Sequence, residues 1–572
     1  MVGSSRRVFI VAVVVCTTVV VASATIGATH ARAAQPVKLA TEARLDLFAT
    51  PAVMELRDGR LVEGRGKVDR MNWRKADEQP RGYSVQTSVS HLAWREFELR
   101  FTPAASGDVT LTLMGPWQEA TKGTLYQAEV YFDDLRADGA TIANGGFESP
   151  TASGGRIDGW QSGGGRLQEA SVEVKAAEGR RFARVWHNET LSTTLRVTGG
   201  QAVSLRFRSR AVVPADFVEM RRVTRHDTPA HLAAKKFARG VNLGNYLEAP
   251  PGQTWGASYS ADDFVHIRRE GFDHVRLPIA WHHYAGPGPE FKLKPEIFQR
   301  ADFLVDQALR NGLNAIVNLH HFDDFTTDPA AQRPKLLAIW RQVAEHYASR
   351  PASVVFEVLN EPKDAATTAV MSDVYAAVLP VIRRSNPDRC VLVGPGRWNQ
   401  VSELPLLRLP DDDLNLLVTL HSYEPFYFTH QGATWAGNDV KPLKGIHFPG
   451  PPSTPLQFDS SVRLAPHVQD WVRRYNAEPA ASNPCGAHVV RDTVREAKEW
   501  SDYYGRPIHF GEFGAIHFAD PQSRANFARE FRQSCEHAGI GWALWDWKAG
   551  FRYWNEKSGA AEPGMHAALF GR

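Results

Sequence analysis

The stretch VVFEVLNEP, from Val354 to Pro362, is an apolar run that ends in polar residues and a proline. A continuous apolar run of this length is typical of a strand that is buried on both faces of a parallel sheet. Because proline cannot extend the hydrogen-bonding pattern, Glu361 lies at the exit of this strand. The stretch IHFGEFG, which starts at Ile508, has the same form and leaves Glu512 at its exit. The two stretches predict a buried parallel sheet with carboxylates at the ends of two strands.

Apolar strands continue to alternate with helical stretches on both sides of these segments, from Arg239 to near the C-terminus. Eight β/α units in about 330 residues are typical of a TIM barrel. We therefore predict an α/β fold in which a catalytic (β/α)8 TIM barrel occupies residues 237–572. The predicted strands are Val241–Leu243, His274–Ile279, Ala315–His320, Val354–Asn360, Val391–Val393, Leu416–His421, Ile508–Glu512 and Trp542–Trp545. The predicted helices include Pro295–Asn311, Lys335–Ser349 and Ser523–His537.

Residues 34–213 have a different texture, in which short alternating segments are separated by Asp, Gly and Pro clusters. Short strands at this spacing predict a β-sandwich of jelly-roll type, as one composite domain or two small ones. Residues 214–236 are charged and have no strong strand pattern, so we interpret them as a linker or a packing arm. The predicted strands include Phe97–Thr102, Val109–Leu113, Ala128–Phe132, Val172–Val174, Phe182–Trp186, Thr193–Val197 and Val203–Phe207.

Residues 1–33 are predicted to be an export signal rather than part of the fold. Arg6 and Arg7 precede an apolar run, and the small-x-small sequence at 31–33 resembles a cleavage site. The pair of arginines also resembles the twin-arginine signal, which directs export after folding. The alternative is an uncleaved membrane anchor, since the run is long enough to span a bilayer. We expect a secreted or periplasmic protein that has no membrane segment after cleavage.

Charge and cysteine content exclude several classes of partner. Removing residues 1–33 takes away three arginines and no acidic residue, so the net charge falls from +3 to zero. A neutral chain offers no electrostatic case for nucleic acid or an anionic membrane, and it suits a neutral substrate. Neither C-x-x-C nor H-E-x-x-H occurs, so we expect no metal site of the zinc type. Cys390, Cys485 and Cys535 follow the signal and allow at most one internal disulfide.

The two carboxylates at the strand exits are the candidate catalytic groups. Strands four and seven of a TIM barrel face one another across its mouth, so Glu361 and Glu512 can converge there. Glycoside hydrolysis needs such a pair, one to protonate the leaving oxygen and one to attack the anomeric carbon. Glu357, deeper on the same strand face, is interpreted as a structural carboxylate with a counter-charge. The glycines Gly511 and Gly514 are expected to let a ligand approach Glu512 closely.

Other strand ends carry side chains that support the same interpretation. An inward Arg276 would hold a carboxylate ionised and oriented. Alternation places His421 and Tyr423 on one face, and His320 ends the third strand pointing inward. Trp545 ends the last strand, where its ring can form a floor for a sugar. Each residue alone is more typical of a satisfied core position, but their coincidence at successive strand ends favours a site.

From about Arg239 to Asp546 the chain resembles glycoside hydrolase family 5, the large cellulase family. The order and strand placement of the matching residues agree with the family. In that family the Glu of the Asn-Glu-Pro triplet is the acid/base and the Glu after the seventh strand is the nucleophile. The resemblance therefore implies that Glu361 is the acid/base and Glu512 the nucleophile, and that Asn360 binds the sugar 2-hydroxyl. The matching residues are Arg276, His320, Asn360-Glu361-Pro362, His421, Tyr423, Glu512 and Trp545.

Two further stretches are similar to bacterial endoglucanases of this family. One is RGVNLGNYLEAP from Arg239, which contains Asn245 and Glu248, and the other is HSYEPFYFTHQGATW from His421. The resemblance implies substrate-binding or supporting roles for Asn245, Glu248 and His321 as well. Some relatives with these stretches also accept mannan. The chain departs from them by a longer connection between Trp435 and Ile508, which bears on the shape of the cleft.

The N-terminal region is similar, over about half its length, to carbohydrate-binding jelly rolls. The similarity rests on NGGFE at 144–148, on the following Gly159-Trp160 and on the β-rich texture. Its tryptophans could stack on sugar faces, although the alternative is that most of them are core residues. These tryptophans are Trp73, Trp94, Trp117, Trp160 and Trp186.

The sequence patterns and the family resemblance together predict a secreted retaining endo-β-1,4-glucanase that needs no metal or organic cofactor. The expected partner is a polysaccharide, β-glucan or mannan, and we expect a monomer. The alternatives on the same barrel are a β-mannanase, a β-1,3-glucanase and a transglycosylase. An alternative of a different class is a non-catalytic polysaccharide-binding protein whose sandwich does the work.

Overall fold

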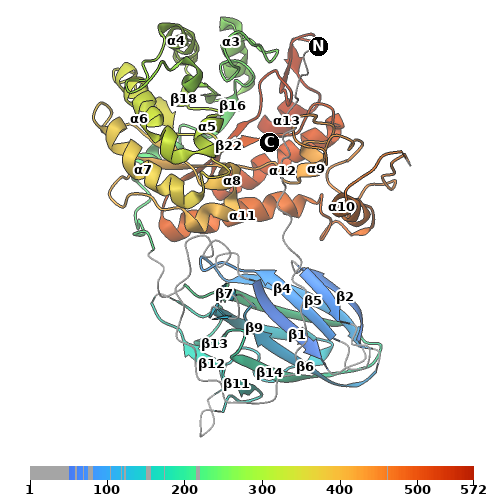
Figure 1. The fold of residues 1–572 in the computed structure, drawn as a ribbon. Coiled ribbons are helices and arrows are strands. Elements are labelled where there is room, and N and C mark those ends of the chain that lie inside the picture. Colours follow the sequence, from blue (N-terminus) through green and yellow to red (C-terminus); the bar gives the residue numbers. More distant parts are fainter. Residues whose placement is uncertain are drawn as a thin grey trace, which may run out of the picture.

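A computed structural model of the chain contains a closed parallel barrel and, before it in the sequence, two packed antiparallel sheets (Figure 1). It describes residues 51–57, 61–67, 70–74, 82–103, 105–116, 119–121, 124–125, 127–149, 156–172, 174–213, 219–459 and 461–571. The predicted architecture, a (β/α)8 TIM barrel preceded by a β-sandwich region, is confirmed. The predicted signal at residues 1–33, with Cys16, and Trp117 lie outside the described residues.

The two N-terminal sheets enclose one apolar core. The first has the strand order β10-β14-β6-β1-β4-β3, with β11 beside β14, and the second has the order β12-β13-β9-β15-β5-β2. Alternation along β6 and β5 sends Leu111, Leu113 and Leu99 into a shared cluster between the sheets. The strands are β1 (Pro51–Arg57), β2 (Leu61–Lys67), β3 (Arg70–Arg74), β4 (Gly82–Ser88), β5 (Arg95–Pro103), β6 (Gly107–Met114), β9 (Val130–Asp138), β10 (Ala140–Thr141), β11 (Gln161–Gly163), β12 (Arg166–Glu169), β13 (Arg181–Val185), β14 (Thr190–Val197) and β15 (Val203–Ala211), and a separate pair is β7 (Glu119–Thr121) and β8 (Thr124–Leu125).

One predicted strand of this region is wrong. Val172 and Val174 belong to no strand, and the Val172 side chain is 93% exposed. Its apolar character made the segment resemble a half-buried strand, but neither valine pairs with a strand in the part of the chain that the structure describes.

The barrel closes through eight parallel strands in sequence order. Five predicted strands extend past the observed ends, three of them by two or three residues, because the chain remains buried after the hydrogen-bonded ladder stops. Ile279, Leu319 and Leu359, which follow β17, β18 and β19, are all fully buried. The strands are β16 (Arg239–Asn242), β17 (His274–Leu277), β18 (Asn314–Asn318), β19 (Val354–Glu357), β20 (Val391–Val393), β21 (Leu416–His421), β22 (Ile508–Phe513) and β23 (Gly541–Leu544).

Helices surround the barrel, and local sequence sets their ends. At the start of α12, Pro521 takes the first helical position and the Asp520 side chain accepts a hydrogen bond from the Ser523 amide. Gly539 ends this helix in a left-handed conformation. The helices are α2 (Pro229–Ala234), α3 (Ala261–Glu270), η1 (Trp281–Tyr284), α4 (Pro295–Arg310), α5 (Asp323–Thr327), α6 (Pro329–His346), α7 (Thr368–Arg383), α8 (Gly396–Asn399), η2 (Val401–Leu406), α9 (Phe426–Thr429), α10 (Pro466–Ala477), α11 (Ala487–Tyr504), α12 (Pro521–Ala538) and α13 (Met565–Phe570), and a small hairpin is formed by β24 (Trp554–Asn555) and β25 (Ala560–Ala561).

The sandwich is packed directly against α11, which lies along the barrel edge that faces it (Figure 1). Leu92, from the loop before β5, belongs to the barrel's own apolar cluster. Arg95 donates hydrogen bonds to Glu499 of α11 and forms an ion pair with Glu496. The described part of residues 214–236 also packs on the barrel, since Met220 lies in the same cluster. This stretch therefore has the contacts of a packing arm.

The long connection between β21 and β22 contains α9, α10 and α11 joined by irregular segments. It starts at the carboxyl end of β21, and Trp471 of α10 packs edge-on against Tyr427 of α9. The three cysteines at 390, 485 and 535 are buried and free, so the one disulfide that their number allows is not formed. Within the described ranges, no helix is long and apolar enough to span a bilayer.

Candidate active site

The candidate catalytic side chains meet at the carboxyl ends of the barrel strands. Glu361 lies four residues after the end of β19, Glu512 is the fifth residue of β22, and Arg276 is the third residue of β17. A parallel sheet brings these ends to one edge, so residues separated by more than 200 positions become neighbours. The structure brings both glutamates and the arginine into one connected group.

Arg276 is the centre of this group and is completely buried. Its Nε and Nη2 donate to the two oxygens of Glu357 at 2.7 and 2.8 Å, which is a bidentate ion pair. Its Nη1 donates to Glu512 Oε1 at 2.7 Å and to Asn242 Oδ1 at 2.9 Å. Nη2 also donates to Asn360 Oδ1 at 2.7 Å. Burial lowers the pKa of Arg276, but the two glutamates outweigh this effect and leave the pKa above its ordinary value.

Glu361 has a raised side-chain pKa and a backbone that is held in one conformation. Its side chain keeps 21% exposure, yet the dense surroundings make burial raise its pKa to about 7, against the opposing charges of Arg276 and Lys363. Its backbone has a left-handed φ of 45°, which is uncommon for a residue other than glycine. The Glu361 amide donates to Asn399 Oδ1 at 2.7 Å.

Glu512 lies in a more strongly hydrogen-bonded environment. Burial raises its pKa above the ordinary value, while His421, Arg276 and the hydrogen bond from Tyr423 act in the opposite direction. Tyr423 Oη donates to Glu512 Oε2 at 2.8 Å, and Arg276 holds the other oxygen. The carboxylate is thus held in one orientation by two donors.

His421 lies between the two glutamates. Its Nδ1 is 2.9 Å from Glu361 Oε1 and 3.7 Å from Glu512 Oε2. Burial lowers the pKa of His421 to about 4, so its imidazole is neutral at pH 7. A neutral ring at this position can accept a hydrogen bond from the protonated Glu361 carboxyl or donate one to its ionised form, without adding a full charge.

The third and eighth strands supply an aromatic wall. The rings of His320 and Trp545 are stacked, with centroids 5.8 Å apart and planes 4° from parallel. Burial lowers the pKa of His320 well below its ordinary value, so this ring is also neutral at pH 7. The neighbouring His321 is exposed and has a left-handed φ of 50°, and its ring lies 6.0 Å from that of Trp255.

Glu248 and Asn245, from the loop after β16, form a separate small network. The buried Glu248 carboxylate accepts hydrogen bonds from the amides of Asn245 and Tyr246. Burial raises the pKa of Glu248 to about 7. The Asn245 side chain donates to the Trp255 carbonyl. No hydrogen bond joins these two residues to the glutamate pair in the described structure, so they sit beside the central group rather than within it.

Two asparagines in the central group were missed at the level of sequence. Asn242 ends β16 with no exposed area, and its amide donates to the Gly511 carbonyl at 2.9 Å while its oxygen accepts from Arg276. Its position at a strand end was the signal that could have found it. Asn399 follows Arg397 and Trp398 in α8, and all three have left-handed φ angles of 47°, 60° and 57° for Arg397, Trp398 and Asn399. No strand pattern points to Asn399.

The expectation for the glycines beside Glu512 is wrong. A Cβ on Gly511 would lie 2.7 Å from Thr419 Oγ1 and 3.0 Å from His421 Nε2. A Cβ on Gly514 would lie 2.3 Å from the Trp545 carbonyl oxygen. These glycines therefore make room for neighbouring protein atoms, and not for a ligand.

Exposed aromatic rings gather on the loops that follow the barrel strands. Their exposed fractions range from 37% to 64%, which is unusual for side chains of this size. They follow β16, β20, β21 and β22, and so they belong to the same end of the barrel as the glutamates. These residues are Trp255, Trp398, Phe426, Trp435 and Phe518.

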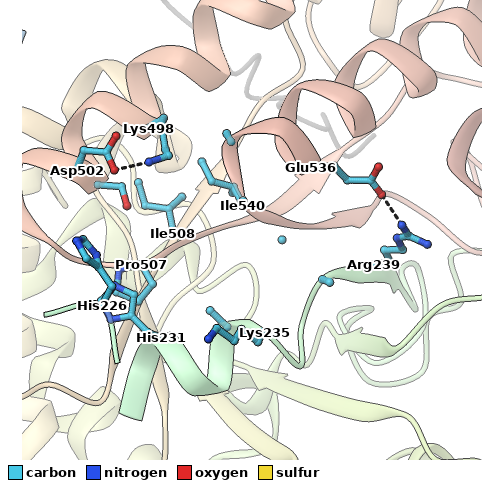
Figure 2. Close-up of a pocket in the computed structure, with 16 residues that line it drawn as sticks. His226, His231, Lys235, Arg239, Lys498, Asp502, Pro507, Ile508, Glu536 and Ile540 are labelled. Atoms are coloured by element: carbon cyan, nitrogen blue, oxygen red, sulfur yellow. Dashed lines mark hydrogen bonds and ion pairs between the residues drawn. The ribbon is translucent and has the colours of Figure 1, made fainter. Parts of the chain in front are cut away.

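A groove with a volume of about 690 Å³ lies at the opposite end of the barrel (Figure 2). It is lined by the starts of β16, β22 and β23, where Arg239, Ile508 and Gly541 lie. Figure 2 shows two of its charged pairs, Lys498 with Asp502 and Arg239 with Glu536. The groove is therefore separate from the carboxylate group, which occupies the other ends of the strands.

In the part of the chain that the structure describes, one group of side chains has donors close enough to hold a metal ion. It consists of Glu361, His421 and Glu512, whose donor atoms all lie within 4.8 Å of one another. One carboxylate oxygen of Glu361 and one of Glu512 are therefore at most 4.8 Å apart. Chemically, the arrangement offers one carboxyl group that holds a proton near pH 7, one oriented carboxylate and a neutral imidazole between them.

The family model described as Cellulase (glycosyl hydrolase family 5) matches residues 234–550, more than half of the chain. Endoglucanase H of Acetivibrio thermocellus is 27% identical over 393 residues, which are 66% of this chain and 38% of that protein. The chain therefore spans well under half the length of this relative.

Two solved structures are similar to the barrel region. One is an endoglucanase that is 31% identical with a TM-score of 0.52, and the match covers 60% of this chain and 99% of that one. The other is Cel5A of Thermotoga maritima in complex with mannotriose, which is 29% identical with a TM-score of 0.51 and covers 59% of this chain and 99% of that one.

Proposed function

The chain belongs to glycosyl hydrolase family 5, the cellulase family, and from this premise we propose that it hydrolyses internal β-1,4 bonds of a glucan with retention of configuration. The family match makes the chain a glycoside hydrolase with an endoglucanase-like barrel and a polysaccharide substrate. It also removes the ground for a purely non-catalytic binding protein. The linkage, the stereochemistry and the roles of individual residues are the proposal.

The observation that carries the proposal is the short separation of the two glutamates. One oxygen of Glu361 and one of Glu512 lie within 4.8 Å of each other. Retaining glycosidases hold their two carboxyl groups about 5–5.5 Å apart, whereas inverting enzymes need about 6.5–9.5 Å to fit a water molecule. The spacing therefore supports direct attack by a carboxylate on the sugar.

In the first step, Glu361 donates its proton to the leaving glycosidic oxygen while Glu512 attacks the anomeric carbon. Because the pKa of Glu361 is raised to about 7, its carboxyl group still carries a proton to donate near neutral pH. Arg276 and Tyr423 each donate a hydrogen bond to one oxygen of Glu512, so the nucleophile is oriented before substrate arrives. The bond to the leaving sugar breaks as the glycosyl-enzyme bond forms.

In the second step, Glu361 has lost its proton and accepts one from a water molecule, which attacks the anomeric carbon and releases Glu512. His421 Nδ1, 2.9 Å from Glu361 Oε1, stabilises whichever protonation state Glu361 has. Asn360 is fixed by Arg276 beside this site, which supports the role of binding the sugar 2-hydroxyl.

The exposed aromatic rings support a polymeric substrate. Trp255 and Trp398 lie on loops after the first and fifth strands, and Trp435 lies on the loop after the sixth. Sugar rings stack on aromatic faces, and rings spread over several loops suit a chain longer than one or two sugars. This spread favours attack within a chain rather than only at its end.

A mannan substrate is the second candidate. The observation in its favour is the similarity to a Thermotoga maritima Cel5A structure that contains mannotriose. The loop with Asn245 and Glu248 and the long connection before Ile508 both border the cleft end of the barrel, so they are where such a preference would be set.

The test is product analysis with the purified full chain on cellulose, mixed-linkage β-glucan, mannan and laminarin. Short oligosaccharides of several lengths from β-glucan, with a rapid fall in viscosity, are the expected result. NMR of the first products should show the β-anomer before mutarotation. Initial release of the α-anomer would contradict retention, and products from mannan or laminarin alone would contradict the glucan assignment.

For the N-terminal region we retain polysaccharide binding as a proposal, together with export through the segment at 1–33 and a monomeric state. Trp160 belongs to the sandwich core, whereas Trp94 and Trp186 are half-buried. The expected result is that changing Trp94 and Trp186 together to alanine weakens retention on insoluble cellulose without changing hydrolysis of a soluble substrate. Unchanged retention would leave the sandwich with a structural role.

A further inference from the structure

The side chains between which the sugar would be cleaved also have the geometry of a metal site. Glu361 Oε1, His421 Nδ1 and Glu512 Oε2 face one another, with the nitrogen 2.9 and 3.7 Å from the two oxygens. A tetrahedral zinc ion binds nitrogen and oxygen at about 2.0–2.2 Å, which places its ligand atoms about 3.3–3.5 Å apart. The two nitrogen-to-oxygen separations lie on either side of this value, and the two carboxylate oxygens lie within 4.8 Å of each other, so side-chain rotations can bring the three atoms to this spacing.

The charges around this group favour a divalent cation. Among the described residues, Arg276 is the one cation that forms ion pairs with these carboxylates by a permanently charged side chain, and it is shared between Glu357 and Glu512. When Glu361 is ionised, three carboxylates face one guanidinium, which leaves an excess of two negative charges. Lys363, whose charge also acts on Glu361, is paired with Asp323 at 3.2 Å.

The ligand side chains are also held in place by a second layer of hydrogen bonds. Arg276 binds the oxygen of Glu512 that does not face His421, and the Asn399 side chain binds the amide of Glu361. Such outer contacts orient metal ligands and raise metal affinity. One imidazole and two carboxylates suit Zn²⁺ and its first-row neighbours better than Mg²⁺ or Ca²⁺, which prefer sites made of oxygen alone.

We propose that Glu361, His421 and Glu512 form a binding site for one divalent transition-metal ion, and that the bound ion excludes polysaccharide from the catalytic centre. The ion replaces the hydrogen that Glu361 and His421 share, and it joins the two carboxylates that hydrolysis requires to be free. The metal is an inhibitor at this site and has no part in the reaction.

The first experiment measures binding without substrate, so its result does not depend on the proposed reaction. The metal-free full chain is titrated with ZnCl2 in a calorimeter, and MgCl2 is titrated in parallel. We expect one Zn²⁺ per chain, no Mg²⁺ binding in the same concentration range, and a Zn²⁺ affinity at least about tenfold weaker in Glu512→Gln and in His421→Phe.

Two controls separate this site from others. His467, which pairs with Asp439 on the surface, is a second place where zinc could bind, and His467→Ala should leave the titration unchanged. Thermal unfolding confirms that each variant is folded, and Zn²⁺ should raise the melting temperature of the unchanged chain by more than that of Glu512→Gln. Equal binding by Glu512→Gln, or binding that disappears in His467→Ala, would overturn the assignment.

The second experiment rests on the proposed function. Zn²⁺ should raise KM for soluble β-glucan without changing kcat, and EDTA should restore the original KM. A fall in kcat at constant KM would show that the ion does not compete with substrate, even if calorimetry finds it bound at the glutamates. If the metal-free chain hydrolyses no β-glucan but still binds Zn²⁺, the result counts against the proposed function and not against the metal site.

Discussion

At the scale of single residues, Glu361 and Glu512 differ in the hydrogen bonds that their carboxyl groups form, and this difference supports the proposal that they have different roles. Glu512 receives hydrogen bonds from Arg276 and Tyr423, whereas the Glu361 carboxyl meets only His421 among the described side chains. A carboxylate that accepts two strong donors is suited to remain charged, and a buried carboxyl with one neutral neighbour is suited to carry a proton. The asymmetry favours Glu512 as nucleophile and Glu361 as acid/base.

Replacing each glutamate should therefore give a different dependence on the leaving group. We expect Glu361→Gln to lower kcat on β-glucan by about 10²–10⁴-fold, because proton transfer to the leaving oxygen is lost. An aryl cellobioside with an acidic phenol needs little protonation and should be affected much less. Glu512→Gln should abolish hydrolysis of both substrates, and steady-state kinetics on the two substrates measures the contrast.

A matched control for these variants is Glu530→Gln. Glu530 is a glutamate on the outer helix α12, and its carboxylate pairs with Arg491 of the neighbouring helix α11. This change should leave both activities intact. Equal loss on both substrates in Glu361→Gln would argue against its role as the acid.

The pH profile should follow from the raised pKa values. Because Glu361 must be protonated to act as the acid, kcat/KM should fall as the pH rises through about 7. Because Glu512 must be ionised and its pKa is also raised, the acidic limb should lie above pH 4.5. The profile is measured from initial rates on β-glucan. An alkaline limb that persists in the residual activity of Glu361→Gln on the aryl substrate would assign that limb to another group.

At the scale of elements, the short turn α8, which follows the neighbouring strand β20, holds Glu361, the proposed acid/base. Its three left-handed residues, Arg397, Trp398 and Asn399, turn the Asn399 side chain back towards Glu361 and leave Trp398 exposed. Side chains with positive φ cost conformational energy, so this turn is kept by the contacts it makes. The Trp398 amide donates to the Pro362 carbonyl, which adds a second link between the two loops.

Asn399→Gly should accordingly lower kcat about 3- to 10-fold, the equivalent of one hydrogen bond of roughly 1 kcal/mol. The alkaline limb should also move to lower pH, because a less constrained Glu361 regains contact with solvent. Arg397→Gly is the matched control, since it has the same backbone conformation and an exposed side chain. If both variants behave alike, the loss comes from the backbone of the turn and not from the bond to Glu361.

At the scale of the whole molecule, the sandwich is joined to the barrel by more than the connecting chain. His91 is buried at the junction, with its ring nitrogen 3.4 Å from Tyr504 Oη of α11 and 3.5 Å from Glu219. Arg222 lies over the ring of Tyr503 at 3.7 Å from its centroid. Buried polar and apolar contacts of this kind couple the stability of the two parts.

We therefore expect a sandwich residue to stabilise the barrel. Leu92→Ala should lower the free energy of unfolding by about 2 kcal/mol, the lower end for a buried leucine because Leu92 keeps slight exposure. The measurement is thermal unfolding together with the β-glucanase activity that remains after heating. Leu232→Ala, on the exposed side of α2, is the control and should have little effect. Unchanged heat resistance of the activity in Leu92→Ala would mean that the two parts unfold independently.

The sequence by itself determined the barrel, the order of its strands and the strand ends at which Glu361 and Glu512 stand. This was possible because burial on both faces leaves a continuous apolar signal along each strand, and a polar residue at its end interrupts that signal. Arg276 was found in the same way. The sequence could not show that Val172 lies in no strand, because exposure depends on whether a neighbouring strand is present.

The tertiary structure alone decided how these strand ends contact one another. Asn399 reaches Glu361 from a different loop, and Gly511 of β22 faces Thr419 of the neighbouring strand β21, so neither contact has a local pattern in the chain. The convergence of Glu361, His421 and Glu512 within 4.8 Å was likewise set by barrel closure. The physical reason is that strand periodicity reports which side of the backbone a residue faces, while the distance to partners far away in sequence depends on packing.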